Sequence, residues 1–430
     1  MEFAKRQCWL LMLISGLAQA AESDFQITAM DGGQISWTNC FSNGVCTVES
    51  ASQLNRANPW IPWRNYFTTN PAGLGLLPSS SPCDFFRLRA VEISTNKEAF
   101  TNLVRSYGLL HTIAGSGADG GVDGVNYWLA RFEGGYATNA ALSRPHFAMA
   151  DTNGNVFIVD KNSHAVLKVT PDRRIHTVAG THASGNGPDG AQLATTVALK
   201  FPNGLWVFAD GTFFVLDTGN GKVRRVDTNG IMTTLFQDKK GMGDGRGLWV
   251  KQDQSVIYYC ASTDLKQWTP SDGVSALNKK FHDLGNIFVN GDVIVATDRG
   301  DNTVWTVDAR TGTRTFLYGN GGTKLVVDNT LAVTNGLDQV RGVWQPPIGG
   351  YFLVTDAGAQ FLYVDRAGLI HIMVDGHGDD HAGDGQWFYA PRTYKFGQLR
   401  SVSMDSQGNL LIVENDLGYV RRIDFQRLTP

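Results

Sequence analysis

The sequence repeats one pattern of short apolar runs along most of its length. The clearest copy spans Thr177 to Asp227 and contains Thr-Val-Ala-Gly, a Gly-rich loop ending in Asp-Gly, and three apolar runs bounded by Gly, Asp or Asn. Such runs predict consecutive strands joined by tight turns. A unit of three or four strands cannot bury both of its faces alone, so we expect the copies to pack against one another.

Each copy contains a strand that ends in an acidic residue. The interval between these acids is roughly 40 to 60 residues, which is typical of propeller blades and not of helical solenoids. The positions are Asp160, Asp217, Cys260 (which replaces the acid in a degenerate copy), Asp298, Asp356 and Glu414. We therefore predict an all-β protein whose residues 107–430 form a six-bladed β-propeller.

The two ends of the repeat region predict how the ring closes. The first copy is preceded by an extra strand, Leu109 to Ala114, and the last copy ends at Ile423-Asp424 with too little chain for its outermost strand. Pairing the extra strand with the last copy would complete the sixth blade and remove the open edges of the ring.

The copy at Thr177–Asp227 resembles an NHL repeat. The resemblance rests on its T-V-A-G, G-x-G-x-D-G, P-x-G, D-G-x-x-x-V-x-D and V-R-R-V-D elements, and weaker copies extend over residues 107–430. It implies a six-bladed propeller in a secreted, bacterial-type protein with a small N-terminal β module. It does not imply a reaction, because the fold hosts binding proteins, lyases and lactonases.

The N-terminus has the pattern of a signal peptide. Lys5 and Arg6 precede an apolar core at residues 8–17, and Ala18-Gln19-Ala20 fits a small-residue cleavage site. The apolar run is too short for a membrane span, and no other long apolar segment exists. We predict a signal peptide at residues 1–20 and a secreted or periplasmic/extracellular protein after cleavage near Ala20.

Residues 21–94 differ from the repeats and predict a small β-sandwich module, followed by a polar linker at residues 95–106. A module of this size has a marginal core, so a disulfide would stabilise it. Cys40 and Cys46 flank a turn, and a bridge from either of them to Cys83 is the alternative. Cys260 lies in an apolar run and is predicted to be a buried free thiol.

Three aromatic residues of the module, Trp60, Trp63 and Tyr66, invite two interpretations. They would form a carbohydrate-binding platform if exposed, whereas packing in the core is the commoner role of such side chains. The formal net charge of the chain is −3, which gives no electrostatic reason to expect nucleic acid or an acidic membrane as a partner.

The start of the innermost strand of each blade lies near the mouth of a propeller's central channel. Alignment of the copies places these residues there: His146, Asn203, Arg246, Gly285 (with His282, Asp283 and Asn286 nearby), Arg341 and Arg400. Three guanidinium groups and an imidazole would bind a carboxylate, sulfate or phosphate. The favoured alternative is that each Arg pairs with an acid of a neighbouring strand, such as Asp298 or Asp356, and joins adjacent repeats.

Two other sets of side chains are candidates for metal binding. The loop Gly376–Gly385 is the densest cluster, and it suits a divalent ion, calcium or zinc, through His377, Asp379, Asp380, His381 and Asp384. The favoured alternative is a solvated Gly-rich loop, and no other cofactor is predicted. The acids that end the strands are expected to accept hydrogen bonds from backbone N–H groups of the following turns instead of binding metal.

The resemblance also suggests enzymes. Peptidyl-amidating lyases hold a channel zinc with several His residues, of which this chain offers only His146 and His282; lactonases use carboxylates and Asn, for which Asn203, Asn286 and Asp283 are candidates. Neither set is complete. The sequence therefore favours a binding protein for an extracellular or envelope protein, peptide, glycan or anionic ligand, and a metal-dependent lyase or lactonase/hydrolase is the alternative. Ligand identity and oligomeric state stay open.

Overall fold

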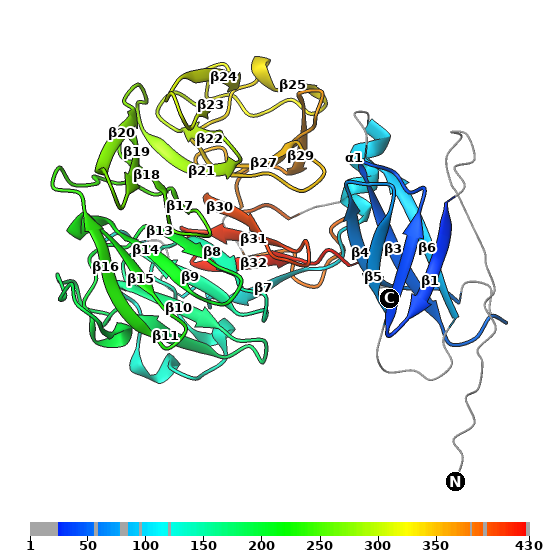
Figure 1. Cartoon of the computed structure of the whole chain (residues 1–430), viewed down its shortest axis with the longest axis horizontal. Coiled ribbons are helices and arrows are strands. Elements are labelled where there is room, and N and C mark those ends of the chain that lie inside the picture. Colours follow the sequence, from blue (N-terminus) through cyan, green and yellow to red (C-terminus); the bar gives the residue numbers. More distant parts are fainter. Residues whose placement is uncertain are drawn as a thin grey trace, which may run out of the picture. The chain divides into compact units, whose positions relative to one another are not determined.

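The computed structural model describes residues 25–55, 59–77, 85–93, 97–118, 122–378, 381–389 and 394–426. The chain divides into two compact units (Figure 1). The first comprises residues 1–109, 387–390 and 424–430, and the second comprises residues 110–386 and 391–423. The predicted signal peptide at residues 1–20, Cys83, Asp379 and Asp380 lie outside the described residues. In the described part, no helix is long and apolar enough to cross a membrane.

The second unit consists of antiparallel sheets built from consecutive strands. The first sheet contains β8 (Pro145–Ala150), β9 (Val156–Asp160), β10 (Ala165–Val169) and β11 (Ile175–Ala179). The second contains β13 (Gly204–Val207), β14 (Phe213–Asp217), β15 (Lys222–Val226), β16 (Ile231–Gln237) and the short β12 (Gln192–Leu193). The third contains β17 (Leu248–Val250), β18 (Ile257–Ala261), β19 (Asp264–Thr269) and β20 (Gly273–Asn278).

Three more sheets follow in the described residues. The fourth contains β21 (Leu284–Asn290), β22 (Val293–Asp298), β23 (Thr303–Asp308) and β24 (Arg314–Tyr318). The fifth contains β26 (Val340–Trp344), β27 (Tyr351–Thr355), β28 (Phe361–Val364), β29 (Leu369–Val374) and the short β25 (Thr330–Leu331). The sixth contains β30 (Leu399–Met404), β31 (Leu410–Glu414), β32 (Tyr419–Ile423) and β7 (Leu110–Ala114). Short 3-10 helices occupy connections: η1 (Ala130–Phe132), η2 (Ala137–Asn139), η3 (Ala194–Thr196), η4 (Thr218–Asn220) and η5 (Ala332–Thr334).

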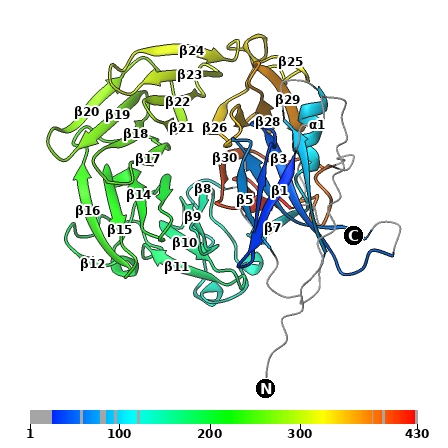
Figure 2. The ribbon, with the colours of Figure 1, turned by 45° about the vertical axis from the view of Figure 1, so that its right-hand side comes forward.

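The first strands of the six sheets form a closed ring. β8 contacts β13, β13 contacts β17, β17 contacts β21, β21 contacts β26, β26 contacts β30, and β30 contacts β8. Figure 2 shows β17, β21 and β26 toward the centre of this unit and β16, β20 and β24 at its rim. The second unit therefore has a propeller fold, as the repeat spacing predicts.

The second strand of each sheet is mostly buried on both faces. β9, β14 and β31 are buried at every residue, and their acids Asp160 and Asp217 are fully inaccessible to solvent. Such strands are continuously apolar because each sheet has a neighbour on either side. Cys260 lies in the corresponding strand β18 and is a buried free thiol, as predicted.

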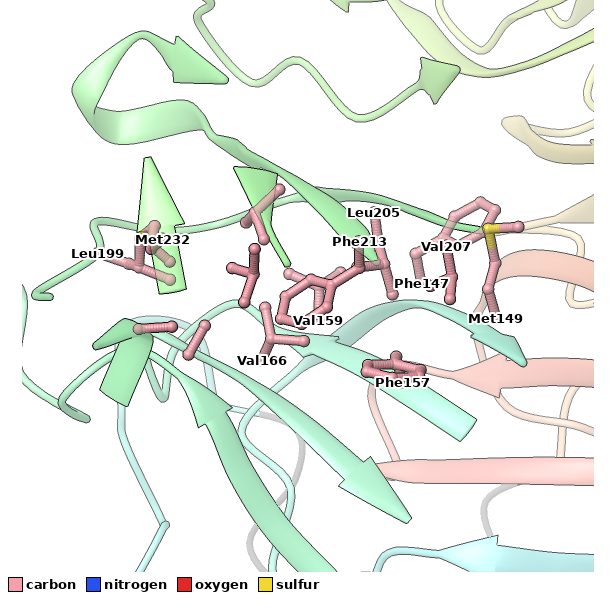
Figure 3. Close-up of a cluster of buried hydrophobic side chains, with 14 of the residues drawn as sticks. Phe147, Met149, Phe157, Val159, Val166, Leu199, Leu205, Val207, Phe213 and Met232 are labelled. Atoms are coloured by element: carbon pink, nitrogen blue, oxygen red, sulfur yellow. The ribbon is translucent and has the colours of Figure 1, made fainter. Parts of the chain in front are cut away.

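The apolar core of this unit lies between neighbouring sheets. Figure 3 shows the cluster between the first and second sheets, where Phe147, Phe157 and Val159 face Leu205 and Phe213. Comparable clusters lie between the second and third, third and fourth, fourth and fifth, and sixth and first sheets. Each sheet thus depends on its neighbours for burial of its faces, which is why a single copy would not fold alone.

The backbones of neighbouring first strands approach closely at glycines. A Cβ at Gly285 would lie 2.6 Å from the carbonyl oxygen of Arg341, and a Cβ at Gly204 would collide with the carbonyl oxygen of Arg246. Side chains also join the strands of the ring, because Ser403 Oγ donates to the carbonyl of Ala148 at 2.7 Å. Small residues at these points bring the first strands together.

The extra N-terminal strand closes the ring, as predicted. β7 pairs antiparallel with β32, with Leu110 opposite Ile423 and His111 opposite Arg422. β7 is therefore the outer strand of the sixth sheet, although β30, β31 and β32 come from the end of the repeat region.

The first unit contains two three-stranded sheets. One has the order β1 (Gln26–Asp31), β2 (Gln34–Thr38), β5 (Gly73–Leu76), and the other β4 (Ile61–Thr68), β3 (Gly44–Ala51), β6 (Phe85–Glu92). Ile35 and Trp37 of β2 share one apolar cluster with Cys46 and Val48 of β3 and with Leu88 of β6. The two sheets agree with the β module that the sequence predicts for residues 21–94.

The segment predicted as a linker forms a helix instead. Helix α1 spans Lys97–Arg105, and Ala99 and Leu103 are buried one turn apart. Tyr107 is also buried in this unit, against Phe388 and Phe425. The second unit begins at Leu110.

One site prediction for the first unit needs correction, and one alternative is decided. Cys40 and Cys46 are buried free thiols, so the structure does not contain the predicted bridge between them. The Cys46 thiol contacts Cys40, and this hydrogen bond lowers the pKa of Cys40 to about 7. Bridges to Cys83 remain predictions. Trp60 is buried beneath Arg87, and Tyr66 packs on Trp37, so of the three aromatic residues only Trp63 is largely exposed, and they do not form an exposed platform.

The pairing of β7 with β32 can be tested by cross-linking. Because His111 and Arg422 are opposite each other, the double variant His111→Cys/Arg422→Cys should form a disulfide on mild oxidation. Mass spectrometry of a non-reduced digest would detect the linked peptides. The variant His111→Cys/Arg225→Cys, which places the second thiol on β15, should give no such link. Absence of a link in the first variant would contradict closure by β7.

Because the first strands approach closely, adding a single methyl group at a ring glycine should lower the free energy of unfolding. Gly204→Ala should lower the free energy of unfolding by about 1–3 kcal/mol, because the new Cβ meets rigid backbone. Gly190→Ala is a matched control, since nothing lies within 4 Å of its Cβ position, and it should change stability by no more than about 0.5 kcal/mol. Equal urea midpoints for the two variants would show that the strands can separate without cost.

Candidate functional site

The residues predicted for the channel mouth lie on the ring of first strands or directly before it. His146, Arg341 and Arg400 belong to β8, β26 and β30; Asn203 immediately precedes β13, and Arg246 lies two residues before β17. Each of these five residues is at most 8% exposed. The structure thus has all five on or near the first strands, and all of them are more buried than a solvent-filled mouth would require.

Arg341 and Arg400 share one carboxylate. Both guanidinium groups form ion pairs with Asp356, which directly follows β27, and all three side chains are 5–6% exposed. Burial would raise the pKa of Asp356, but the charges of Arg341 and Arg400 outweigh it and hold that pKa below its ordinary value. This pairing was one of the two Arg–Asp contacts expected from the sequence.

A second carboxylate is shared in the same way. Asp283 pairs with Arg246 at 3.3 Å and also with Arg299. Arg299 was not among the predicted site residues. It directly follows the acid Asp298, and Lys161 has the same position after Asp160, but the other four copies have no basic residue there, so the repeat pattern does not identify Arg299.

The two clusters carry unequal numbers of opposite charges. Four guanidinium groups share two carboxylates, which leaves a formal excess of two positive charges. Arg side chains remain protonated in proteins, so the excess persists when the groups are buried. These two clusters are therefore positive when counted by themselves, and the carboxylates of Asp244 and Asp416 also act on Arg246 and Arg400.

His146 is a buried, neutral imidazole. Burial and then the charge of Arg400 hold its pKa well below the ordinary value, with smaller contributions from Lys161, Arg246 and Arg341. Among the described residues, neither of its ring nitrogens has a hydrogen-bond partner. A neutral imidazole offers one donor and one acceptor, so His146 can bind a ligand hydroxyl or amide as well as an anion.

Other polar atoms of the ring are also buried without a partner in the described part of the chain. They are Nε of Arg246, Arg341 and Arg400 and Oδ1 of Asn203 and Asn286. Buried polar groups are nearly always hydrogen-bonded in proteins, and an unpaired one is costly. Several such groups on one ring mark it as a place where a polar ligand or ordered water completes the hydrogen bonding.

The acids that end the second strands have a different role from the one expected. Except for Asp356, they accept hydrogen bonds from the backbone preceding the first strand, such as Ser143 N–H to Asp160 at 2.9 Å and Lys200 N–H to Asp217 at 2.8 Å. Asp298 binds this backbone in the fourth sheet, so it does not pair with a ring Arg as suggested. Burial raises the pKa of Asp160 to about 7.

A cavity of about 350 Å³ opens beside Asn203. Its lining includes Lys161, Phe201 and the acids Asp123 and Asp244, which end two of the Gly-rich loops. The Nζ atom of Lys161 is 3.8 Å from Asp123, so positive and negative groups face each other across a small space. Such a lining suits a small polar ligand, and it brings the Gly-rich loops of separate repeats to one site.

The loop predicted to bind metal is only partly described, because Asp379 and Asp380 lie outside the described residues. His377 hydrogen-bonds through Nε2 to the carbonyl of Ala357, whereas His381 bonds through Nε2 to Thr112 Oγ1 at 2.5 Å. Asp384 lies 3.4 Å from His381 and pairs with Arg421 at 2.8 Å. The two His residues are thus engaged separately.

Comparisons with known proteins show the fold. No family model matches the chain. The Arabidopsis thaliana protein SUPPRESSOR OF QUENCHING 1, chloroplastic, is 30% identical over 99 residues, which cover 22% of this chain and only 9% of that protein.

Three solved bacterial structures resemble nearly the whole chain. One is a protein of unknown function from Bacteroides thetaiotaomicron (12% identity, TM-score 0.59, covering 94% of this chain and 98% of that one). The others are auxiliary nutrient binding proteins from Bacteroides thetaiotaomicron (10%, 0.55, 93% and 96%) and Bacteroides ovatus (10%, 0.53, 91% and 93%). These neighbours are β-propeller-like proteins, and at such low identity the likeness shows the fold alone.

The shared carboxylate of Asp356 should contribute strongly to stability. Asp356→Asn leaves Arg341 and Arg400 buried without their counter-charge, so we expect the free energy of unfolding to fall by about 3–5 kcal/mol at pH 7. Urea denaturation followed by circular dichroism would measure this loss.

Asp292→Asn is the matched control, because Asp292 and its partner Arg310 are 65% and 74% exposed. It should change stability by no more than about 0.5 kcal/mol. Since the pKa of Asp356 is lowered by folding, its contribution is present above the unfolded pKa of about 4 and is lost as the pH falls through the folded pKa. The difference between wild type and Asp356→Asn should therefore shrink in acid; a constant difference would contradict the ion-pair explanation.

Proposed function

We propose that this chain is a secreted binding protein whose second unit is a six-bladed, NHL-type β-propeller. Its ligand binds at the ring of first strands and carries a carboxylate or sulfate group, as on an acidic glycan or peptide. The first unit is a small β-sandwich module that precedes the propeller in the sequence. The following observations support this proposal.

The excess positive charge of the ring is the observation that carries the proposal. Asp356 and Asp283 neutralise only half of the formal charge of Arg246, Arg299, Arg341 and Arg400. A ligand carboxylate or sulfate would supply the missing negative charge and accept hydrogen bonds from the planar guanidinium forks. The expected Arg–Asp pairs and an anion site are thus compatible, because each carboxylate is shared between two Arg residues.

His146 and the amides add recognition of neutral groups. The imidazole and the Oδ1 atoms of Asn203 and Asn286 can bind hydroxyl or amide groups, which an anion site alone would not distinguish. A ligand that combines one acidic group with several hydroxyls, such as a uronic acid, matches this set of donors and acceptors.

Two of the similar structures are described as auxiliary nutrient binding proteins, which agrees with a binding role. Secretion or location in the envelope rests on the signal-peptide pattern at residues 1–20 and on the resemblance to secreted bacterial proteins of the NHL type. Such a protein would meet glycans and peptides outside the cytoplasm.

The geometry favours binding over the metal-dependent enzyme that the sequence also suggests. A lyase of the NHL type would need several His residues at one channel site. His146 is 5% exposed, whereas the side chain of His282 is 74% exposed, so the two imidazoles do not share one buried site.

Binding of an acidic sugar should depend on the ring Arg residues. We expect glucuronate to bind in isothermal titration calorimetry and glucose, the matched neutral sugar, to bind at least about tenfold more weakly. Arg400→Lys keeps the charge but removes the fork, and it should weaken glucuronate binding by about tenfold.

Arg310→Lys is the control variant, because Arg310 lies in an exposed ion pair away from the ring and should leave the affinity unchanged. Both variants should keep the unfolding midpoint of the wild type within a few degrees, which separates lost binding from lost structure. Equal affinities for glucuronate and glucose, or full affinity in Arg400→Lys, would refute recognition of an anion by the ring.

A further inference from the structure

The acid that ends the second strand, together with the residue three positions after it, can be compared from sheet to sheet. In the second sheet, Asp217 accepts a hydrogen bond from the backbone of Lys200, and the residue three positions after the acid, Asn220, donates its side-chain amide to Asp217. The Asp217 carboxylate is also paired with Arg224 at 3.1 Å. In this best-preserved copy, the buried acid is therefore surrounded by donors.

The fourth sheet has different side chains at the same positions. The backbone of His282 donates to Asp298 at 3.0 Å, as that of Lys200 does to Asp217, and the residue three positions after the acid is Asp301. His282, Asp298 and Asp301 each offer one ligand atom, and these atoms all lie within 4.8 Å of one another. In the first and sixth sheets, the residues in the place of Asp301 are Ser163 and Leu417, which give no comparable set.

Replacement of Asn220 by Asp301 changes the local electrostatics. An amide donates to the buried carboxylate, whereas a second carboxylate can only accept, so Asp298 and Asp301 repel each other. Asp298 is fully buried, and its two oxygens accept the backbone N–H groups of His282 and Asp283 at 3.0 Å, which leaves further lone pairs available. A cation bound between the two carboxylates would offset their repulsion.

We propose that His282, Asp298 and Asp301 bind a divalent transition-metal ion, with Zn²⁺ as the best match. One imidazole nitrogen and two carboxylate oxygens form a donor set that suits zinc better than magnesium or calcium, which prefer oxygen ligands alone. The side chain of His282 is 74% exposed and that of Asp301 is 35% exposed, so water or a ligand group can complete the coordination from the solvent side.

This site is separate from the loop containing His377 and His381, where the sequence predicts metal binding. It also does not rest on anion binding by the ring, because none of its three ligands belongs to the Arg clusters. The alternative is that Nδ1 of His282 only hydrogen-bonds to Asp301, a contact that is present in the structure. The two possibilities differ in whether the full-length protein binds Zn²⁺ through these residues.

Calorimetric titration of the untagged, full-length protein with ZnCl₂ tests the site. We expect one Zn²⁺ per chain at this site, and a loss of affinity of about tenfold or more in Asp301→Asn and in His282→Gln. Asp301→Asn reproduces the side chain of the best-preserved copy, so this variant should fold normally, with the circular dichroism spectrum and metal-free unfolding midpoint of the wild type.

His381→Gln is the matched control, because it removes an imidazole from the other candidate loop and should keep the affinity of this site for Zn²⁺. Wild-type affinity in both Asp301→Asn and His282→Gln would overturn the proposal, as would a wild-type protein that binds no Zn²⁺. Loss of Zn²⁺ binding only in His381→Gln would assign the metal to the loop of His377 and His381 instead.

Discussion

The propeller depends on the close contact of backbones in its ring of first strands. At Gly204 and Gly285 the neighbouring strand lies where a Cβ would be, so any larger residue at these points would force the strands apart and destabilise the ring. The close ring buries the side chains that flank these glycines, Asn203 and Asn286. Burial then decides the chemistry of the site, because polar groups enclosed in this way require partners. The glycines that allow close strand contact therefore also enclose the neighbouring polar side chains.

Charge sharing is the second feature of this centre. Asp356 and Asp283 each pair with two Arg side chains, so single carboxylates join adjacent strands electrostatically. The net charge of the chain is slightly negative and gives no indication of this local field. His146 stays neutral within it, since protonation in a buried and positive environment is unfavourable. The ring consequently combines guanidinium groups with a neutral donor and acceptor.

Departures from the repeat pattern indicate where individual copies have gained special properties. Asn220 and Asp301 occupy the same position in two sheets, yet one donates to a buried carboxylate and the other places a second carboxylate beside it. Cys260 replaces the acid in the third sheet, and burial raises its thiol pKa to about 12, so it remains an uncharged packing residue. The same scaffold therefore accepts an apolar replacement at one copy and a candidate metal site at another.

The sequence alone determined the all-β class, the strands of the repeats, closure by residues 109–114 and the residues on the ring. These features follow from local periodicity and turn residues, which sequence patterns record directly. Only the tertiary structure decided that Asp356 and Asp283 are shared, that Arg299 joins the site, that Asp298 binds backbone and that residues 97–105 are helical. Each of these depends on which groups meet after folding, and the distance between them along the chain does not reveal it.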